Sequence, residues 1–587
     1  MSLGHVDIQI KRLIFRQICF PELSVAGTMR PRLVFSAWSR LFRFFRAASW
    51  GASTPPRSGG SDLAQPCRGT TATLASSSKQ SLQAHDGHLN LVAFAFEFPK
   101  NLIDIHVLTN VRHWRLKHSP FFRLLASAGC VAAFYSLYFF GLDRCGLLSK
   151  DEPRYAAIGL EMARSGDFVM PVLWGQPWYE KPPLLYWMTA GASRLGIPGD
   201  LAPRLPVALL SAVFVAAFFV MVAREFGSRV ALFAASILGT SVGWLAYSHI
   251  AVTDMPLSAP FAAAMLLLIR PAISWRRALA SGILIGLAAL AKGLVPFALL
   301  LPAIWFLRRE IRALLVVTGA ALAVAAPWYA AISLRAGRAF FDEFIWKQHF
   351  ARFISDIPQH VQPWWYYAPV LLAGLAPWTP LILLARRRLI HDARARFLLA
   401  WFLWGLFFFS ASRNKLPGYV LPLLPAAAVL LALALDAAPR GWAALTLGAC
   451  AALVYILPLA EGVLPAALIS GIRQAHITFP IAPLIIVGLL AIGAATLALR
   501  GLRTAAVLLV SAGLVIGVLH FSIDAYPVLD RRVSTRAVWR NFDKRRGNAC
   551  IASGSWEFRY GLSYYFGFAV PDCTGAPGEA PLRPAGS

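Results

Sequence analysis

Residues 143–183 form a block rich in charged and aromatic side chains, between long hydrophobic segments. Its first half contains Asp151-Glu152-Pro153-Arg154-Tyr155. A carboxylate near an acceptor group can take a proton or balance a cationic transition state, so Asp151 and Glu152 are candidates for a catalytic base or a sugar-orienting pair. The alternative is structural, because either carboxylate can cap a helix that has Pro153 at its first position.

The second half of the block contains Tyr179-Glu180-Lys181-Pro182-Pro183. Its two prolines stiffen the backbone beside an anion, a cation and an aromatic ring. Lys181 is suited to binding a phosphate, and Glu180 to binding a sugar hydroxyl or a metal ion. A surface charge pair without a function is the alternative interpretation.

Two ionisable residues interrupt hydrophobic segments further along the chain. Asp254 opens one segment, and Lys292 lies between two others. Because charges are costly within a membrane, both are functional candidates, although a lysine can also extend its ammonium group to the membrane surface. Lys415, in the stretch Ser412 to Tyr419, adds a cation where an anionic lipid headgroup would lie.

A polar stretch at 346–353 contains an imidazole and a guanidinium group among aromatic rings. His349 is a candidate metal ligand together with Glu180, but a single histidine often serves as a hydrogen-bonded structural residue. Arg352 is a further candidate cation for binding a phosphate. The aromatic residues at 364–367 are expected to anchor the next hydrophobic segment at the membrane interface.

The composition indicates what must hold these side chains. Hydrophobic residues make up 58% of the 587 positions and charged residues 14%, whereas soluble domains have about 25% charged residues. About thirteen hydrophobic runs of roughly membrane-spanning length predict an all-α polytopic membrane protein, in which the fifth and sixth runs can also be one broken helix. The runs are 120–141, 205–223, 229–246, 251–269, 276–291, 294–307, 313–331, 364–385, 397–411, 416–435, 441–459, 478–499 and 504–523.

Basic residues predict the orientation of these runs. Arginines precede the first run and then gather in alternate connections, and the positive-inside rule makes that side cytoplasmic. The loops 142–204 and 332–363 and the tail then face the periplasm, as do all the candidate residues. This distribution accounts for the net charge of +28 without a nucleic-acid partner.

The chain divides into three predicted parts. Residues 1–118 fit neither a signal peptide nor a span, so we expect a disordered basic extension or a start codon placed too far upstream. Residues 119–523 form the transmembrane domain, and 524–587 a small periplasmic domain. The seven cysteines show no metal-ligand spacing. In an oxidising compartment Cys550 and Cys573 can form a disulfide, and two unrelated thiols are the alternative.

One amphipathic helix is expected inside the first periplasmic loop. Tyr155, Ile158 and Met162 recur at helical spacing, and Gly166 can end the helix. Such a helix would lie on the membrane surface with its apolar face toward the lipid.

The sequence has no Walker motif and no GxGxxG before a helix. Neither ATP-driven transport nor a cytoplasmic nucleotide-sugar site is therefore indicated. A lipid-linked donor reached from the outer leaflet fits better. The sequence indicates no specific cofactor, and a divalent metal held by Glu180 and His349 is an option.

Five short motifs, taken in order, resemble the aminoarabinose transferases of lipid A, which stand with the protein O-mannosyltransferases among the polyprenyl-phosphate-dependent GT-C glycosyltransferases. The likeness covers about residues 120–570, and the number of spans agrees. The motifs are Asp151-Glu152-Pro153-Arg154-Tyr155, Tyr179-Glu180-Lys181-Pro182-Pro183, Arg204-Leu205-Pro206, Ala291-Lys292-Gly293 and Lys415-Leu416-Pro417-Gly418-Tyr419.

The resemblance implies a bacterial inner-membrane enzyme that moves a sugar from undecaprenyl phosphate to an acceptor at the periplasmic face. It implies catalysis by acidic residues of the first loop, which match Asp151 here, and donor-phosphate contacts that match Lys181. It also implies that Glu180 and a loop histidine, matched to His349, can bind a metal.

These interpretations combine into one predicted site. Cations neutralise the departing phosphate, which is usually the largest catalytic term, while Asp151 faces the anomeric carbon or the acceptor. Asp151 must act as a base if the acceptor is a hydroxyl, and need not if it is an ionised phosphate. The candidates are, for catalysis, Asp151, Glu152 and Asp254; for the donor phosphate, Lys181, Arg154, Lys292, Arg352, Lys415 and Tyr419; and for orienting the sugar, Tyr155, Tyr179 and Arg204.

Two other classes of protein are alternatives to this enzyme. A transporter or lipid flippase would also carry ionisable groups in its spans, but internal repeats with broken helices in both halves are not visible. A non-catalytic assembly or sensor protein would leave the charges of the first loop unused. The expected partners are a polyprenyl-phosphate sugar, lipid A or another envelope acceptor, and membrane lipids.

Overall fold

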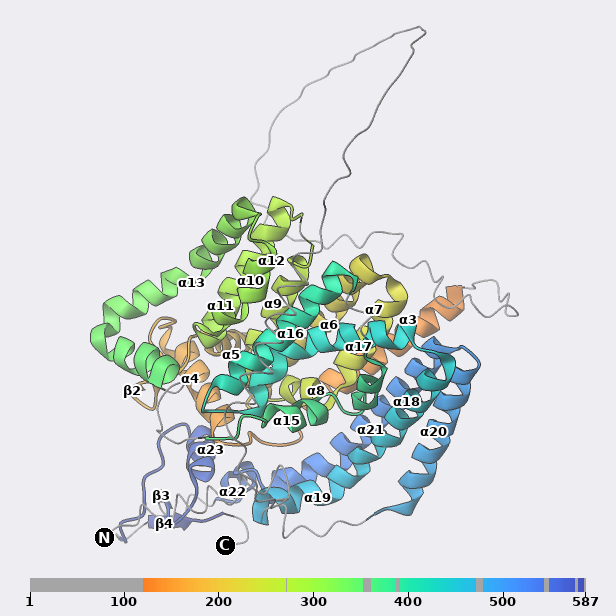
Figure 1. The fold of residues 1–587 in the computed structure, drawn as a ribbon. Coiled ribbons are helices and arrows are strands. Elements are labelled where there is room, and N and C mark those ends of the chain that lie inside the picture. Colours follow the sequence, from red (N-terminus) through yellow and green to blue (C-terminus); the bar gives the residue numbers. More distant parts are fainter. Residues whose placement is uncertain are drawn as a thin grey trace, which may run out of the picture. The chain divides into compact units, whose positions relative to one another are not determined.

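A computed structural model of the chain describes residues 120–584, apart from residue 271 and the segments 352–359, 387–390, 471–478, 543–547 and 576–578. The predicted extension 1–118 lies outside this part. The described residues are mainly helical, and their two sheets have two strands each (Figure 1). Helices satisfy their backbone hydrogen bonds internally, which a lipid environment demands. The predicted all-α membrane class is confirmed.

Seven helical segments within the described residues are long and apolar enough to cross a membrane. An eighth arises if α7 (Ser228–Thr240) and α8 (Val242–Ser248), bent by 59°, form one span. The seven are α6 (Leu201–Phe226), α13 with η1 (Ile311–Phe340, Phe341–Ala351), α16 (Ala393–Ala411), η4 with α17 (Pro417–Leu423, Leu424–Ala437), α18 to α19 (Arg440–Ala452, Leu453–Tyr455, Ile456–Ser470), α20 (Ile481–Leu499) and α21 (Arg503–Arg532).

The helices of the other predicted runs are not among these seven, so the number of thirteen crossings stays a prediction. Gly293 separates the fifth run from the sixth, because its positive φ of 67° ends the helix. Only glycine fits there, since a Cβ would lie 2.2 Å from the His349 ring. These other helices are α3 (Pro120–Tyr138), α9 (Asp254–Leu267), α10 (Trp275–Lys292), α11 (Val295–Leu299), α12 (Leu301–Phe306), α15 (Tyr367–Gly374) and η2 (Thr379–Leu384).

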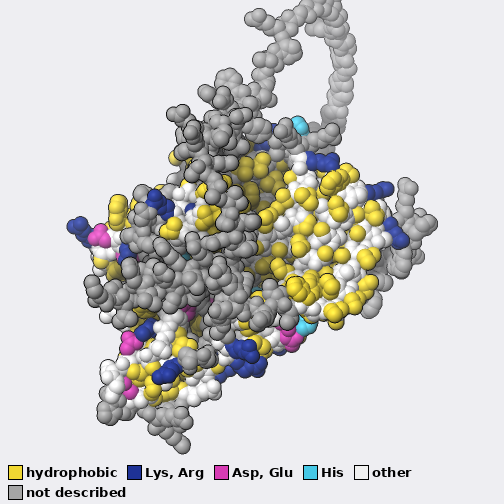
Figure 2. Space-filling view, turned by 60° about the horizontal axis from the view of Figure 1, so that its bottom comes forward, with side chains coloured by type: hydrophobic (Ala, Val, Ile, Leu, Met, Phe, Trp, Pro, Cys, Tyr) yellow, Lys and Arg dark blue, Asp and Glu magenta, His cyan; other side chains and the backbone are white. Residues whose placement is uncertain are grey.

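The surface carries a broad hydrophobic area. Figure 2 shows one face on which hydrophobic side chains spread between borders of charged residues. On α20, Ile485, Ile486, Leu489 and Ile492 are each at least 60% exposed. An uninterrupted apolar surface of this kind suits contact with lipid tails.

The first polar loop folds into α4 (Asp151–Ser165), a short hairpin of β1 (Val172–Leu173) and β2 (Gln176–Pro177), and α5 (Leu184–Arg194). Helix α4 ends at the left-handed Gly166, as predicted, but Lys150 precedes it and neither carboxylate caps it. Its apolar residues Tyr155, Ile158 and Met162 are buried in the protein core. The prediction that this face lies on lipid is therefore wrong, because neighbouring helices cover it.

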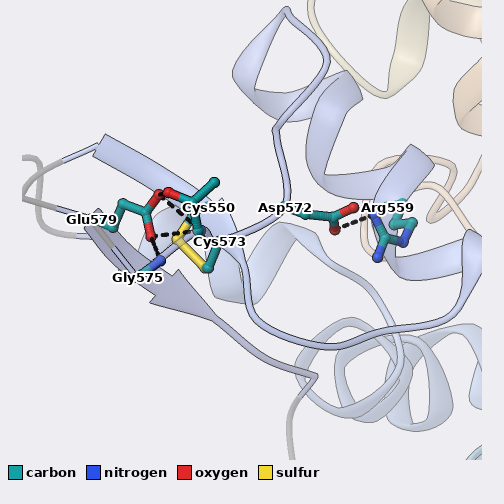
Figure 3. Close-up of a disulfide and its surroundings, with 7 residues drawn as sticks. Cys550, Arg559, Asp572, Cys573, Gly575 and Glu579 are labelled. Atoms are coloured by element: carbon teal, nitrogen blue, oxygen red, sulfur yellow. Dashed lines mark hydrogen bonds and ion pairs between the residues drawn. A yellow bond between two sulfur atoms is a disulfide. The ribbon is translucent and has the colours of Figure 1, made fainter.

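The C-terminal tail is a small unit of α22 (Arg536–Arg540), β3 (Asn548–Ile551), α23 (Trp556–Phe566) and β4 (Glu579–Leu582), in which β3 pairs with β4 in parallel. Helix α21 runs to Arg532, so the predicted domain boundary at residue 524 lies inside a helix. The predicted Cys550–Cys573 disulfide is present (Figure 3).

Candidate active site

A cavity of about 800 Å³, called here the polar cavity, lies where α4, the segment 177–181, the start of α9, the end of α10, η1 and the segment 414–419 meet. Most of the residues singled out from the sequence line it, although they come from five separate stretches of the chain. These are Asp151, Arg154, Tyr155, Tyr179, Glu180, Lys181, Asp254, Lys292 and Tyr419.

Arg154 is the best-connected cation of this cavity. It is buried, pairs with Asp151, and donates from Nη1 to Glu180 over 3.2 Å. Burial lowers its pKa, but the negative charges of Glu180 and Asp151 outweigh that effect and raise the pKa above its ordinary value. The guanidinium group therefore stays charged and fixes both carboxylates.

Trp178 and Lys181 add donors on the same side of the cavity. The Lys181 ammonium lies 3.4 Å from Glu180 Oε1. The indole N–H of Trp178 is buried and has no hydrogen-bond partner among the described residues. A buried polar group without a partner is costly, and Trp178 lines the polar cavity.

The opposite wall carries the pair of Lys292 and Asp254, whose charged atoms are 2.7 Å apart. Lys292 ends α10 and Asp254 begins α9, and the Lys292 ammonium lies 4.6 Å from the ring centre of Tyr419. Gly418 makes this approach feasible, because a Cβ there would lie 2.5 Å from Asp254 Oδ1.

A second cavity of about 320 Å³, called here the apolar cavity, adjoins the first. Its lining is mainly hydrophobic, yet Glu180, Lys181 and Lys292 line both cavities. The charges thus lie at the junction between a polar and an apolar compartment. The hydrophobic lining includes Leu257, Leu294, Val295, Ala298, Phe344, Phe350, Phe408 and Phe409.

Glu152 and Arg204 are not on the wall of either cavity. Both Glu152 oxygens accept hydrogen bonds from Arg204 over 2.7 Å, and they also accept from the backbone N–H groups of Leu148 and Ala251. The Nη1 and Nη2 groups of Arg204 also donate hydrogen bonds to the backbone carbonyl oxygens of residues 142, 145 and 146. The predicted catalytic and sugar-orienting roles therefore do not fit, since this buried pair ties α4 to α6.

Lys415 is also turned away from both cavities. Its ammonium group donates to the carbonyl oxygens of Gln362 and Ser412. Burial lowers its pKa. The geometry does not support the predicted phosphate contact, because these donors already hold the loop backbone together.

The predicted metal site does not fit the arrangement of His349. This residue and Glu180 line the apolar cavity, but His349 Nε2 accepts from the Leu294 N–H over 3.2 Å, and Nδ1 donates to Phe344 O over 2.8 Å. No lone pair of the ring is left for a metal. Arg352, the other candidate in this stretch, lies outside the described residues.

Sequence reasoning missed several residues that line the polar cavity, among them Tyr247, Thr253 and Glu343. Glu343 lies on η1 and holds Lys347 over 2.8 Å and Gln348 over 2.9 Å. Glu343 could have been singled out from the sequence, because it is a carboxylate in the predicted outer loop 332–363. Tyr247 directly follows the hydrophobic run 229–246 and gave no such signal.

Together the helices and the paired cavities define a polytopic membrane protein with a charged site beside an apolar one, and its fold is similar to that of solved ArnT structures. The crystal structure of ArnT from Cupriavidus metallidurans bound to undecaprenyl phosphate aligns with a TM-score of 0.60 and 24% identity, over 77% of this chain and 85% of that one. The apo crystal structure of ArnT gives a TM-score of 0.61.

Sequence comparisons reach the same group of proteins. Residues 180–330 match the family described as dolichyl-phosphate-mannose-protein mannosyltransferase. An undecaprenyl phosphate-alpha-4-amino-4-deoxy-L-arabinose arabinosyl transferase of Pseudomonas fluorescens is 33% identical over 324 residues, 52% of this chain and 55% of the relative. One from Pseudomonas aeruginosa is 33% identical over 354 residues, 55% of this chain and 64% of the relative.

The chain spans between about half and two thirds of the length of these curated relatives. The matches confirm the resemblance to the aminoarabinose transferases and protein mannosyltransferases that the five motifs predicted.

Proposed function

We propose that this protein is a polyprenyl-phosphate-dependent glycosyltransferase of the bacterial inner membrane, which transfers aminoarabinose or a related sugar from undecaprenyl phosphate to lipid A or another envelope acceptor. The observation that carries the proposal is the junction of the two cavities, where Lys181 and Lys292 lie between a polar and an apolar compartment. A polyprenyl-phosphate donor has the same division into a charged group and an apolar tail.

The donor phosphate would bind at this junction. Lys181 and Lys292 supply charge-assisted hydrogen bonds to its oxygens, and the tail would enter the apolar cavity beside Phe408 and Phe409. The sugar then extends into the polar cavity, whose wall includes Tyr155, Trp178 and Tyr179.

Transfer breaks the bond between the anomeric carbon and the phosphate oxygen, and the phosphate departs with the electron pair. Lysine charges stabilise this leaving group. An acceptor oxygen attacks the anomeric carbon from the opposite side and inverts its configuration. If the acceptor is a hydroxyl, its proton passes to Asp151, which lines the polar cavity and is held by Arg154; an ionised phosphate acceptor has no such proton.

The side of the membrane is also part of the proposal. The arginine-rich connections support a cytoplasmic location for the membrane face on which they lie. The site, on the other face, would then be periplasmic. The Cys550–Cys573 disulfide supports an oxidising compartment for the tail. Reporter fusions after residue 530 test this directly, because activity of a cytoplasmic reporter there would contradict the orientation.

The activity is tested by incubating purified protein with undecaprenyl-phosphate aminoarabinose and lipid A, followed by mass spectrometry of the lipids. The expected product is lipid A heavier by one aminoarabinose unit, with release of undecaprenyl phosphate. A variant with Lys181→Met and Lys292→Met is the control and should give no product. Movement of the intact donor across vesicles without sugar transfer would instead favour the transporter alternative.

A further inference from the structure

The C-terminal tail reaches Arg154, a residue of the polar cavity wall, through Tyr560 of α23. The centre of its ring lies 5.1 Å from the Arg154 guanidinium carbon. The other groups around this guanidinium come from residues 150–180, namely Asp151, Glu180, Trp178, Tyr155 and the Lys150 carbonyl. Among the described contacts of Arg154, Tyr560 is thus the one supplied by a distant part of the chain.

Helix α23 packs directly on α4. Leu147, Ala156 and Tyr564 form a small buried cluster between them. Next to it, the Tyr565 hydroxyl donates to Asp200 over 2.8 Å and accepts from the Leu147 N–H over 2.8 Å. These contacts fix how close Tyr560 can lie to Arg154.

Arg536 attaches the same tail to the loop that precedes α4. Its guanidinium group lies 2.6 Å from Asp200 and 2.9 Å from Asp530. It also donates to the carbonyl oxygens of Asp143 and Arg144. Buried charges are tolerated only when they are paired in this way, so this side of the loop has a defined position relative to the tail.

The Cys550–Cys573 disulfide closes a loop that contains the whole of α23. Asp572, beside the disulfide, pairs with Arg559 over 2.5 Å, and Arg559 precedes Tyr560 in the helix (Figure 3). Phe558 and Leu562 on another side of α23 pack on Ile551 of β3. The helix is therefore supported from the disulfide on one side and placed against α4 on the other.

We propose that the disulfide-closed tail completes the active site and that Tyr560 is a positioning residue for Arg154. This inference rests on the proposed transferase activity. A cation over an aromatic ring is attracted to it, so Tyr560 keeps the guanidinium between Asp151 and Glu180. Those two carboxylates then face the donor sugar in one arrangement, although the tail itself touches no reacting atom.

Kinetics of three purified variants test the inference. Tyr560→Leu removes the ring and is expected to raise the KM for the donor by about two- to tenfold, with a smaller change in kcat. Tyr560→Phe keeps the ring and should restore the wild-type KM, because the Tyr560 hydroxyl makes no hydrogen bond among the described residues. Phe568→Leu, on an exposed tail residue that contacts Phe566, is the matched control.

Hydrogen exchange provides a second readout that does not depend on the reaction. The amides at the start of α4 should exchange faster in Tyr560→Leu, and also in wild-type protein after reduction of the disulfide, but not in Tyr560→Phe or Phe568→Leu. An unchanged donor KM together with unchanged exchange in Tyr560→Leu would overturn the inference while leaving the transferase activity intact. If wild-type protein has no transfer activity, the proposed function is overturned. The hydrogen-exchange rates of the α4 amides would then be the remaining test of whether the tail positions α4.

Discussion

The Lys292 ammonium lies 2.7 Å from the Asp254 carboxylate, and the two residues occupy opposite ends of adjacent helices. Lys292 ends α10, and Asp254 begins α9. Both charges are placed favourably for the helix dipoles, since anions are stabilised at an N-terminus and cations at a C-terminus. The pair therefore costs little in the resting protein, and a bound phosphate can share the lysine.

Separating the two partners should distinguish their structural role from their functional one. Lys292→Met leaves a largely buried carboxylate unpaired and is expected to destabilise the protein by about 1–3 kcal/mol. Adding Asp254→Asn should restore most of the thermal stability in detergent, but transfer activity should stay at least about tenfold below wild type, because the phosphate has lost a cation. Full activity in the double variant would exclude Lys292 from donor binding.

Glu152 and its neighbour Asp151 are expected to respond in opposite ways to loss of charge. Glu152→Gln leaves buried Arg204 without a counter-charge, and breaking such a pair costs about 3–5 kcal/mol. We expect a large fall in the melting temperature and poor accumulation in the membrane. If Glu152→Gln has normal stability but has lost transfer activity, Glu152 has a catalytic role after all.

Asp151→Asn should leave the fold intact, because Asp151 does not cap α4 and its side chain is about one third exposed. Transfer to a hydroxyl acceptor is expected to fall by about 10²–10⁴-fold if Asp151 is the base. Turnover is measured with the purified variant and a polyprenyl-phosphate sugar. Glu161→Gln, on the same helix but off the cavity wall, is the matched control, and equal turnover in both variants would remove Asp151 from the reaction.

Lys415→Met is expected to lower stability without changing the KM for the donor. It removes the ammonium group that binds the carbonyl oxygens of Gln362 and Ser412, and unpaired buried carbonyls cost about 1–3 kcal/mol. Lys181→Met is the useful comparison, since it should raise the donor KM with little change in melting temperature. A raised KM in Lys415→Met at normal stability would restore its predicted phosphate role.

Much of this protein could be predicted from local sequence. Hydrophobic runs of membrane length predicted the helices, because burial in lipid depends on the composition of each segment alone. Short motifs predicted several residues of the cavity wall, including Asp151, Lys181 and Lys292. Cysteine spacing in the tail predicted the disulfide. Each of these features depends on residue type and on neighbours close in the chain.

Only the tertiary structure decided where each side chain points and which distant segments meet. Asp151 and Glu152 are consecutive, yet one lines the polar cavity and the other is bound by Arg204, because successive residues of a helix point in directions about 100° apart. Lys415 was indistinguishable from a phosphate ligand until its carbonyl partners were visible. Tyr560 reaches Arg154 through the packing of α23 on α4, a contact between segments some 400 residues apart that no local pattern specifies.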